Sequence, residues 1–184
     1  GGRSATVGTT CHFQPPAGRG WRMAVDELRA AGVERMDGAA IEGFLRSQHT
    51  GVLGLPAAGA PYLVPMSYGY DGGDRLYFSF FLGPTSRKAD LAEAADAARF
   101  LVYHADSMFA WESVLLEGSI SAVPADEVET LEAVLADTWR PALFEAEHFS
   151  RGASVYAFDI AAQSGLRHTG LPPGFRRGVG KNPE

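Results

Sequence analysis

The sequence is short of cysteine, of lysine and of long apolar runs. Its single cysteine, Cys11, excludes an intramolecular disulfide and a zinc site made of several thiolates. No apolar run approaches the roughly 20 residues that a membrane-spanning helix needs. The first residues also lack the charged and then apolar order of a signal peptide. These absences lead us to expect a cytoplasmic protein.

Acidic residues outnumber basic ones, so the formal net charge is −6, and lysine occurs only as Lys88 and Lys181 although arginine is abundant. Nucleic-acid binding needs a basic face that displaces counterions from phosphates, so DNA and RNA are not expected partners. The histidines are scattered without the i, i+4 spacing of a helical metal site, so no metal is expected. The serine-hydrolase, Rossmann and P-loop motifs are missing as well.

Length and composition indicate one globular domain with tails. At 184 residues, of which 46% are hydrophobic and 21% charged, the chain can bury one sizeable core but not two. Residues 1–22 are rich in glycine, proline and threonine and show no periodicity. We interpret them as an extension or an expression remnant that precedes Met23. The domain is expected over residues 23–172, with a C-terminal tail over 173–184.

Two packing helices are predicted before the first strand. Residues 23–31 are the first candidate. The second helix begins after Asp37, which is a good N-cap residue. Within it, Ile41, Phe44 and Leu45 have the i, i+3, i+4 spacing of a helix with one apolar face.

The rest of the domain is predicted to consist mainly of strands and tight turns. Because proline cannot donate to a ladder, the strand that contains Pro65 should lie at a sheet edge or carry a bulge there. The DGGD sequence at 71–74 is a strong hairpin turn, since glycine tolerates the positive φ that such turns require. The expected strands are 50–55, 62–70, 75–82, 98–104, 111–124 and 154–160, with a loop at 105–110 and helices over 86–95 and 125–137. This order favours a mainly β or α+β fold, a small antiparallel barrel with helices at its mouth.

The stretch GPTSRKADLAEAAD, at 83–96, places two cations in the first turn of an amphipathic helix. A helix N-terminus carries about half a positive charge, so cations there are disfavoured by about 0.3–1 kcal/mol each. Arg87 offers a planar fork and Lys88 a point charge, and both are suited to a phosphate. The alternative is a solvated helix start whose cations pair with Asp90 or Glu93. The spacing by itself leaves both interpretations open.

The run from Pro61 to His104, followed by WESVLLEGSI, resembles the pyridoxamine 5'-phosphate oxidase-like superfamily of FMN-binding split β-barrels. It is most similar to the branch of flavin-nucleotide-binding proteins related to nitroimidazole-resistance proteins. The resemblance spans about residues 37–160 and depends on the order of its pieces: a proline-containing strand, a hairpin, an LYF strand, an SRK helix start, and a strand from Ser-Val to Glu-Gly. It implies a six-stranded antiparallel split β-barrel with flanking helices, forming a homodimer with FMN between the subunits.

The resemblance also implies which residues contact the cofactor. Arg87 and Lys88 would hold the FMN phosphate, with help from Ser86. A strand whose main chain follows the isoalloxazine ring would supply Val64, Pro65, Met66, Ser67 and Tyr68. Further contacts are expected from Phe78, Ser79, Ser113 and Trp111, the last of which would cover the ring from the partner subunit or act as an interface aromatic. Among the polar side chains, those expected to line the flavin are Tyr68, Ser79 and Ser113.

Two departures from the relatives narrow the predicted function. The C-terminal Arg-His-Asp-Arg motif of true pyridoxamine 5'-phosphate oxidases has only LRHTG as its counterpart, so activity on pyridoxine phosphate is not expected. Ser79 replaces the histidine that nitroimidazole-resistance relatives carry, so nitroreduction by that route is not expected either. We predict an FMN-binding oxidoreductase with two-electron chemistry on a small molecule, in which the flavin itself is the reactive group. The alternatives are a non-catalytic flavin-binding or storage protein, or a split barrel for deazaflavin or haem, with His104 or His168 as axial ligand.

Overall fold

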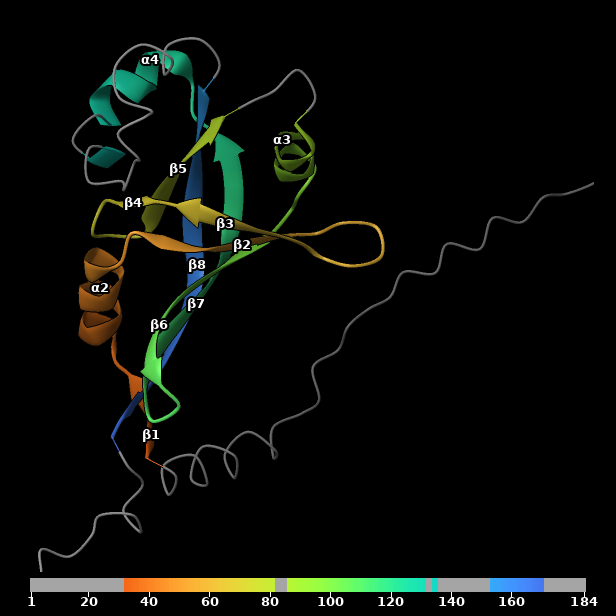
Figure 1. The fold of residues 1–184 in the computed structure, drawn as a ribbon. Helices are drawn as coiled ribbons and strands as arrows, with labels where there is room; N and C mark the ends of the chain where they lie inside the picture. The colour runs from red at the N-terminus through yellow and green to blue at the C-terminus, as the bar shows by residue number, and fades with distance from the viewer. Residues whose placement is uncertain (1–31, 82–85, 132–133, 136–152, 171–184) are drawn as a thin grey trace, which may run out of the picture.

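Alternation of buried and exposed residues produces strands that pair into one antiparallel sheet in the computed structural model (Figure 1). The structure describes residues 32–81, 86–131, 134–135 and 153–170. The strands are β1 (Val33–Met36), β2 (Thr50–Leu55), β3 (Tyr62–Ser67), β4 (Gly69–Tyr70), β5 (Arg75–Phe81), β6 (Ala98–Ser107), β7 (Ala110–Ala122) and β8 (Ala153–Thr169). The helices are α2 (Gly38–Ser47), α3 (Arg87–Glu93) and α4 (Ala125–Val128), followed by the 3-10 turn η1 (Glu129–Leu131).

The strand order is β3-β2-β6-β7-β8-β5-β4, with β1 paired to β8 outside this path. In Figure 1, β2 and β3 cross the long strands β7 and β8 at a steep angle, as in a barrel that is open on one side. The predicted fold class, a mainly antiparallel split β-barrel with few helices, is confirmed. Eight strands are described where six were expected, because the short strands β1 and β4 add to the main set.

The core fills the inside of this curved sheet. Its members are alternate residues of the strands together with the apolar face of α2, which carries Ile41, Phe44 and Leu45 as predicted. Large aromatic residues dominate it; the fully or almost fully buried ones are Tyr68, Phe78, Phe80, Phe100, Tyr156 and Phe158. A second, smaller cluster lies on the other face of β5 and β8, where residues of 123–135 pack on Tyr77 and Val155.

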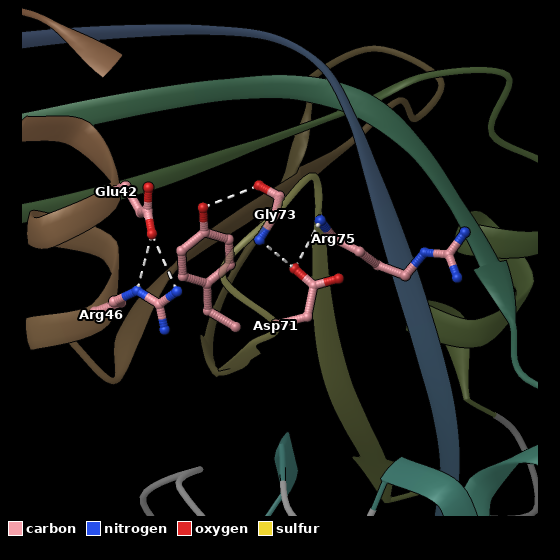
Figure 2. A network of polar contacts seen from close by, with 6 residues as sticks. Glu42, Arg46, Asp71, Gly73 and Arg75 are labelled. Carbon is pink, nitrogen blue, oxygen red and sulfur yellow. Dashed lines mark hydrogen bonds and ion pairs between the residues drawn. The ribbon is translucent and has the colours of Figure 1, made fainter. Parts of the chain in front are cut away.

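Helix α2 is capped as predicted and is fixed to the β4–β5 turn through Arg46. The guanidinium carbon of Arg46 is 5.6 Å from the centroid of the Tyr70 ring, and its Nη2 donates to Oε1 of Glu42 at 3.0 Å. Figure 2 shows this pair beside the turn, where the Tyr70 hydroxyl donates to the Gly73 carbonyl at 2.9 Å. Gly72 has φ +85°, and a Cβ there would collide with Nη2 of Arg46. Glycine is therefore required at this position of the turn.

The edge position predicted for the Pro65 strand is confirmed, since β3 is the last strand of the sheet and pairs with β2 only. The loop expected at 105–110 is wrong. Strand β6 continues to Ser107, β7 begins at Ala110, and the two form one long hairpin. The last strand is also longer than predicted: β8 continues to Thr169 and pairs with β7 from Tyr156 to its end.

Several expectations fall outside the described residues. These are the helix at 23–31, the extension at 1–22, the tail at 173–184, and residues 132–133 and 136–137 of the helix expected over 125–137. Among the residues that are described, no helix is long and apolar enough to cross a membrane.

Candidate functional site

The two neighbouring cations of α3 lie against aromatic rings. The Nζ atom of Lys88 is 4.2 Å from the ring centroid of Phe80 in β5, and 3.5 Å from the Sδ atom of Met66 in β3. The Cζ atom of Arg87 is 5.5 Å from the ring centroid of Tyr62, also in β3. Both cations of α3 are therefore directed toward the edge strand.

Neither cation is paired with a carboxylate in the part of the chain that the structure describes. The sequence offered Asp90 and Glu93 as partners. Asp90 is exposed, and Glu93 instead accepts a hydrogen bond from the Tyr156 hydroxyl at 3.5 Å. The pairing with Asp90 or Glu93 is therefore not found among the described residues, whereas the Arg87 side chain is exposed to solvent, as the alternative interpretation also expected.

Burial lowers the pKa of Lys88 below its ordinary value. The amine is half-buried, so it loses part of its hydration shell, and desolvation disfavours the charged form. The contacts with the ring and with the thioether sulfur return part of this loss without cancelling the charge. A bound phosphate would supply the missing negative charge and would raise this pKa again.

Ser86 caps α3, as predicted. Its Oγ accepts a hydrogen bond from the backbone N–H of Ala89 at 3.4 Å. Because the cap uses an oxygen lone pair, the hydroxyl hydrogen is left to donate to a ligand. The helix is held against the core by Ala89 and Ala92, which are both buried.

Strand β3 presents two different faces. Tyr62, Val64 and Met66 pack against the core, whereas Leu63 and Pro65 lie on the outer face of the sheet. Because β3 pairs with β2 only, its second edge is open among the described strands. The predicted main-chain contacts with a flavin ring would therefore come from an open strand edge beside α3.

Three predicted site residues have side chains that do not face the cations of α3: two are buried in the core, and one lies on the other face of β5. The Tyr68 side chain is 2% exposed and donates its hydroxyl to the Leu45 carbonyl at 2.8 Å, so a contact from Tyr68 would come from its main chain. The Phe78 side chain is fully buried in the core. Ser79 follows Phe78 in β5, so its side chain lies on the face of this strand opposite to Phe78. Its buried Oγ has no hydrogen-bond partner among the described residues. The expectation that the Tyr68 side chain lines the flavin therefore differs from the structure.

Trp111 and Ser113 belong to the other end of the sheet. They lie near the start of β7, beside the β6–β7 turn, and Figure 1 shows that turn and α3 at opposite ends of the molecule. The Trp111 ring centroid is 6.3 Å from that of His168, whose Nδ1 is 2.6 Å from the Phe109 carbonyl oxygen. One copy of the chain therefore does not bring these residues to the cation pair.

Histidine and acidic residues give no sign of a metal. His104 is exposed, and its Nε2 is 3.1 Å from Oδ1 of Asp106. Within the described ranges there is no group of three or more histidine, cysteine or acidic side chains that could hold a metal ion.

Sequence reasoning missed Tyr62 and Phe80, the two rings beneath the cations. Alternation along the strands was the available signal: Tyr62 has the parity of Val64 and Met66, and Phe80 that of Phe78. It places these residues on one side of each strand. The alternation does not reveal that α3 packs beside these two rings.

Comparison with known proteins places the whole described domain in one family. The model of the family described as pyridoxamine 5'-phosphate oxidase matches residues 37–167. No curated protein matches the chain.

Solved structures of low sequence identity share the fold. An FAD-binding protein from Mesorhizobium loti is 20% identical with a TM-score of 0.61, and the match covers 74% of this chain and 99% of that one. An FAD and heme binding protein from Mycobacterium smegmatis is 19% identical with a TM-score of 0.60, and the match covers 77% of this chain and 75% of that one. A candidate 5-nitroimidazole antibiotic resistance protein from Bacteroides thetaiotaomicron is 17% identical with a TM-score of 0.56, and the match covers 74% of this chain and 89% of that one. At these identities, the likeness establishes the fold alone.

Proposed function

The chain belongs to the pyridoxamine 5'-phosphate oxidase family, and on that premise we propose that it is a flavoprotein that binds FMN and oxidises or reduces a small molecule. The observation that carries the proposal is the pair Arg87 and Lys88, two adjacent cations without a carboxylate partner in the described chain. Two of the similar structures are of proteins named for FAD binding, which supports a flavin as the ligand.

The cation pair suits a phosphate monoester. A phosphate carries nearly two negative charges at pH 7 and offers three acceptor oxygens. The guanidinium group of Arg87 can bind two of these oxygens side by side, and Lys88 can bind the third as a point charge. Ser86 adds a hydroxyl donor at the same corner. The residues present therefore fit the phosphate end of FMN.

The ring of the flavin would lie along the open edge of β3. Main-chain groups from Val64 to Tyr68 would contact its polar rim, as predicted from the sequence. FMN supplies the two-electron chemistry when bound, while the chain positions the ring and excludes water from one side of it. Ser79 has no titratable side chain, and it lies on the far face of β5 from Phe80. We therefore assign no acid or base to it.

A second copy of the chain would complete the site. The outer face of β2, β3, β6 and β7 carries large apolar side chains that nothing in the described chain covers: Leu63, Tyr103 and Leu115 are 66%, 58% and 40% exposed. Such a face is typical of an interface. A twofold partner seated there would bring its own Trp111 and Ser113 toward the cation pair, which one copy alone does not do.

A pocket interrupts the same face. It has a volume of about 380 Å³ and lies at the loop end of the β2–β3 hairpin, where it is lined by Leu55, Pro56, Pro61, Leu63, Arg99 and Glu117. Arg99 and Glu117 form an ion pair at 3.0 Å on its rim. An apolar hollow on an apolar face gives a partner side chain a place to insert, which favours the dimer.

The test begins with the visible absorption spectrum of the purified full chain, followed by mass spectrometry of what heat releases. We expect a flavin spectrum and FMN near one per chain. Binding of added FMN and of riboflavin is then compared, and FMN should bind at least about 100-fold more tightly if its phosphate meets two cations. A protein that binds neither flavin would overturn the proposal.

The dimer has its own measurement. Replacing Leu115 by arginine, Leu115→Arg, puts a charge in the centre of the apolar face and should convert a dimer to monomers in sedimentation velocity, with loss of bound flavin. The matched control is Asp74→Arg, an exposed position in the β4–β5 turn and outside this face, which should remain dimeric. A wild-type chain that is monomeric with flavin bound would contradict the shared site.

A further inference from the structure

The geometry points to Phe80 and Met66 as the residues that position the ammonium group of Lys88 for the phosphate of a bound flavin. This inference rests on the proposed function, and it concerns how the site keeps its charge available. The two residues lie in different strands, β5 and β3, at the place where the open barrel brings them to α3.

Phe80 is held from one side so that its other side is left for the cation. The Tyr156 ring stacks on Phe80 with a centroid distance of 4.2 Å and an interplanar angle of 23°. The Lys88 Nζ atom is also 4.2 Å from the Phe80 centroid, and since Tyr156 occupies one face, the ammonium takes the other. Phe80 is completely buried, so its ring presents a fixed surface.

The ring that stacks on Phe80 also binds a carboxylate of α3. Glu93 is five residues beyond Lys88 in this helix, which is not the i+3 or i+4 spacing at which helical side chains meet. The Tyr156 hydroxyl donates to Oε1 of Glu93 at 3.5 Å. Burial and the charge of Glu93 both raise the pKa of Tyr156, so this hydroxyl keeps its proton and remains a donor at neutral pH.

Uncharged neighbours and a carboxylate neighbour of Lys88 would have opposite effects on the binding of an anion. A carboxylate beside Lys88 would cancel its charge and would have to be displaced by an incoming phosphate. The π face of Phe80 and the sulfur of Met66 attract the ammonium more weakly and leave its positive charge uncancelled. The half-buried amine then meets a phosphate in a medium where charges attract more strongly than in water.

The first experiment measures the dissociation constants of FMN and riboflavin for the full chain and two variants, Phe80→Leu and Met66→Leu. Riboflavin has the same ring without the phosphate, so the ratio of the two constants reports the phosphate contact alone. We expect Phe80→Leu to reduce the preference for FMN by about 5- to 30-fold and Met66→Leu by about 2- to 5-fold, with riboflavin affinity unchanged.

Phe158→Leu is the matched control, because Phe158 is equally buried but contacts Phe78 rather than a cation. It should lower stability as Phe80→Leu does and leave the preference for FMN unchanged. If Phe80→Leu and Met66→Leu keep the wild-type preference, or if Phe158→Leu loses it equally, the positioning role is overturned.

A second experiment uses the wild-type chain and so does not depend on a folded variant. Lysine occurs only at positions 88 and 181, so protein labelled with 13C-lysine gives two Cε–Hε signals. The ring current of Phe80 should move the Lys88 signal upfield of the Lys181 signal, and added inorganic phosphate should shift the Lys88 signal alone. Two signals at ordinary positions in the unliganded protein would overturn the placement of Lys88 over Phe80.

The two proposals fail in different ways. If wild-type protein binds FMN no better than riboflavin, the phosphate site and hence the proposed function are wrong. If wild-type protein prefers FMN, and Lys88→Met loses that preference while Phe80→Leu and Met66→Leu keep it, then only the positioning role is wrong.

Discussion

Two arginines of this molecule lie over tyrosine rings at nearly the same distance, yet their surroundings differ. Arg46 is 5.6 Å from the Tyr70 centroid and Arg87 is 5.5 Å from the Tyr62 centroid. Arg46 is also bonded to Glu42 at 3.0 Å, so its charge is balanced within α2 (Figure 2). No such partner is described for Arg87, and its neighbour Lys88 is a second unbalanced cation.

The difference separates a structural cation from one that is available to a ligand. An aromatic ring orients a cation in both places, so the ring by itself does not identify a binding site. The carboxylate decides the role. Glu42 balances the charge of Arg46, as in Figure 2, whereas no carboxylate among the described residues balances Arg87 or Lys88, so their charge is available to an anion.

Replacing both open cations should have the largest effect. The double variant Arg87→Ala with Lys88→Ala removes two charge-assisted contacts of about 1.5–3 kcal/mol each. We expect FMN affinity to fall by about 100-fold or more, measured by fluorescence titration, while riboflavin affinity is unchanged. Arg46→Ala is the control, because it removes a cation that is already paired with Glu42. We expect this variant to bind FMN as tightly as the wild type. An equal loss in both variants would remove the distinction between Arg46 and the two cations of α3.

Substitutions beside Arg46, the cation that is paired with Glu42, should change the stability of the fold instead of the affinity for FMN. Gly72→Ala introduces a Cβ at φ +85° and displaces the Arg46 guanidinium. We expect the free energy of unfolding to fall by about 2 kcal/mol in urea denaturation, with no change in the preference for FMN. In Gly73→Ala, the added Cβ meets only ordinary contacts, with Asp71. A comparable loss of stability in that control would mean that neither the positive φ of Gly72 nor its contact with Arg46 is the cause.

Alkaline pH should weaken FMN binding before it affects an ordinary lysine. The protonated amine binds the phosphate, and burial lowers the pKa of Lys88 in the free protein. FMN affinity is therefore complete below that pKa and declines by about tenfold as the pH rises through it. In Lys88→Arg the decline should be absent up to about pH 11, because guanidinium keeps its proton. An identical decline in both proteins would assign it to another group.

The smallest effect expected is a gain. The lowered pKa means that charged Lys88 is less favourable in the folded than in the unfolded chain at neutral pH. Lys88→Met should therefore raise the free energy of unfolding by clearly less than about 1 kcal/mol at pH 7 in the absence of flavin, because solvent screens an amine that is only half-buried. The gain should disappear as the pH rises to about 10.4, the ordinary pKa of lysine. Arg46→Met should instead lose stability, because it leaves Glu42 without its partner.

Local signals were sufficient for a large part of the fold. Asp37 was expected to cap a helix, and its Oδ1 accepts from the Ala40 N–H at 2.8 Å. Pro65 was expected at a sheet edge because it lacks a donor, and β3 is the last strand of the sheet. The 71–74 turn was read from its glycines. In each case the cause lies within a few residues of the effect.

Long-range pairing explains most of what was missed. The expected loop at 105–110 is part of a hairpin because β7 pairs with β6 on one side and with β8 on the other. The Tyr68 side chain was expected to line the flavin, but its hydroxyl reaches Leu45 of α2, 23 residues earlier. Hydrophobic periodicity within one strand does not reveal which neighbouring element its side chains meet.

The sequence by itself determined the family, the order of the elements and the presence of two adjacent cations at a helix start, because these depend on residue type and spacing. Only the tertiary structure decided that those cations have no carboxylate partner among the described residues. Lys88 meets Phe80 and Met66, and Glu93 turns to Tyr156, through contacts between strands and a helix that are distant in sequence. A charge is available or neutralised according to what lies within a few ångströms of it, and the fold sets those distances.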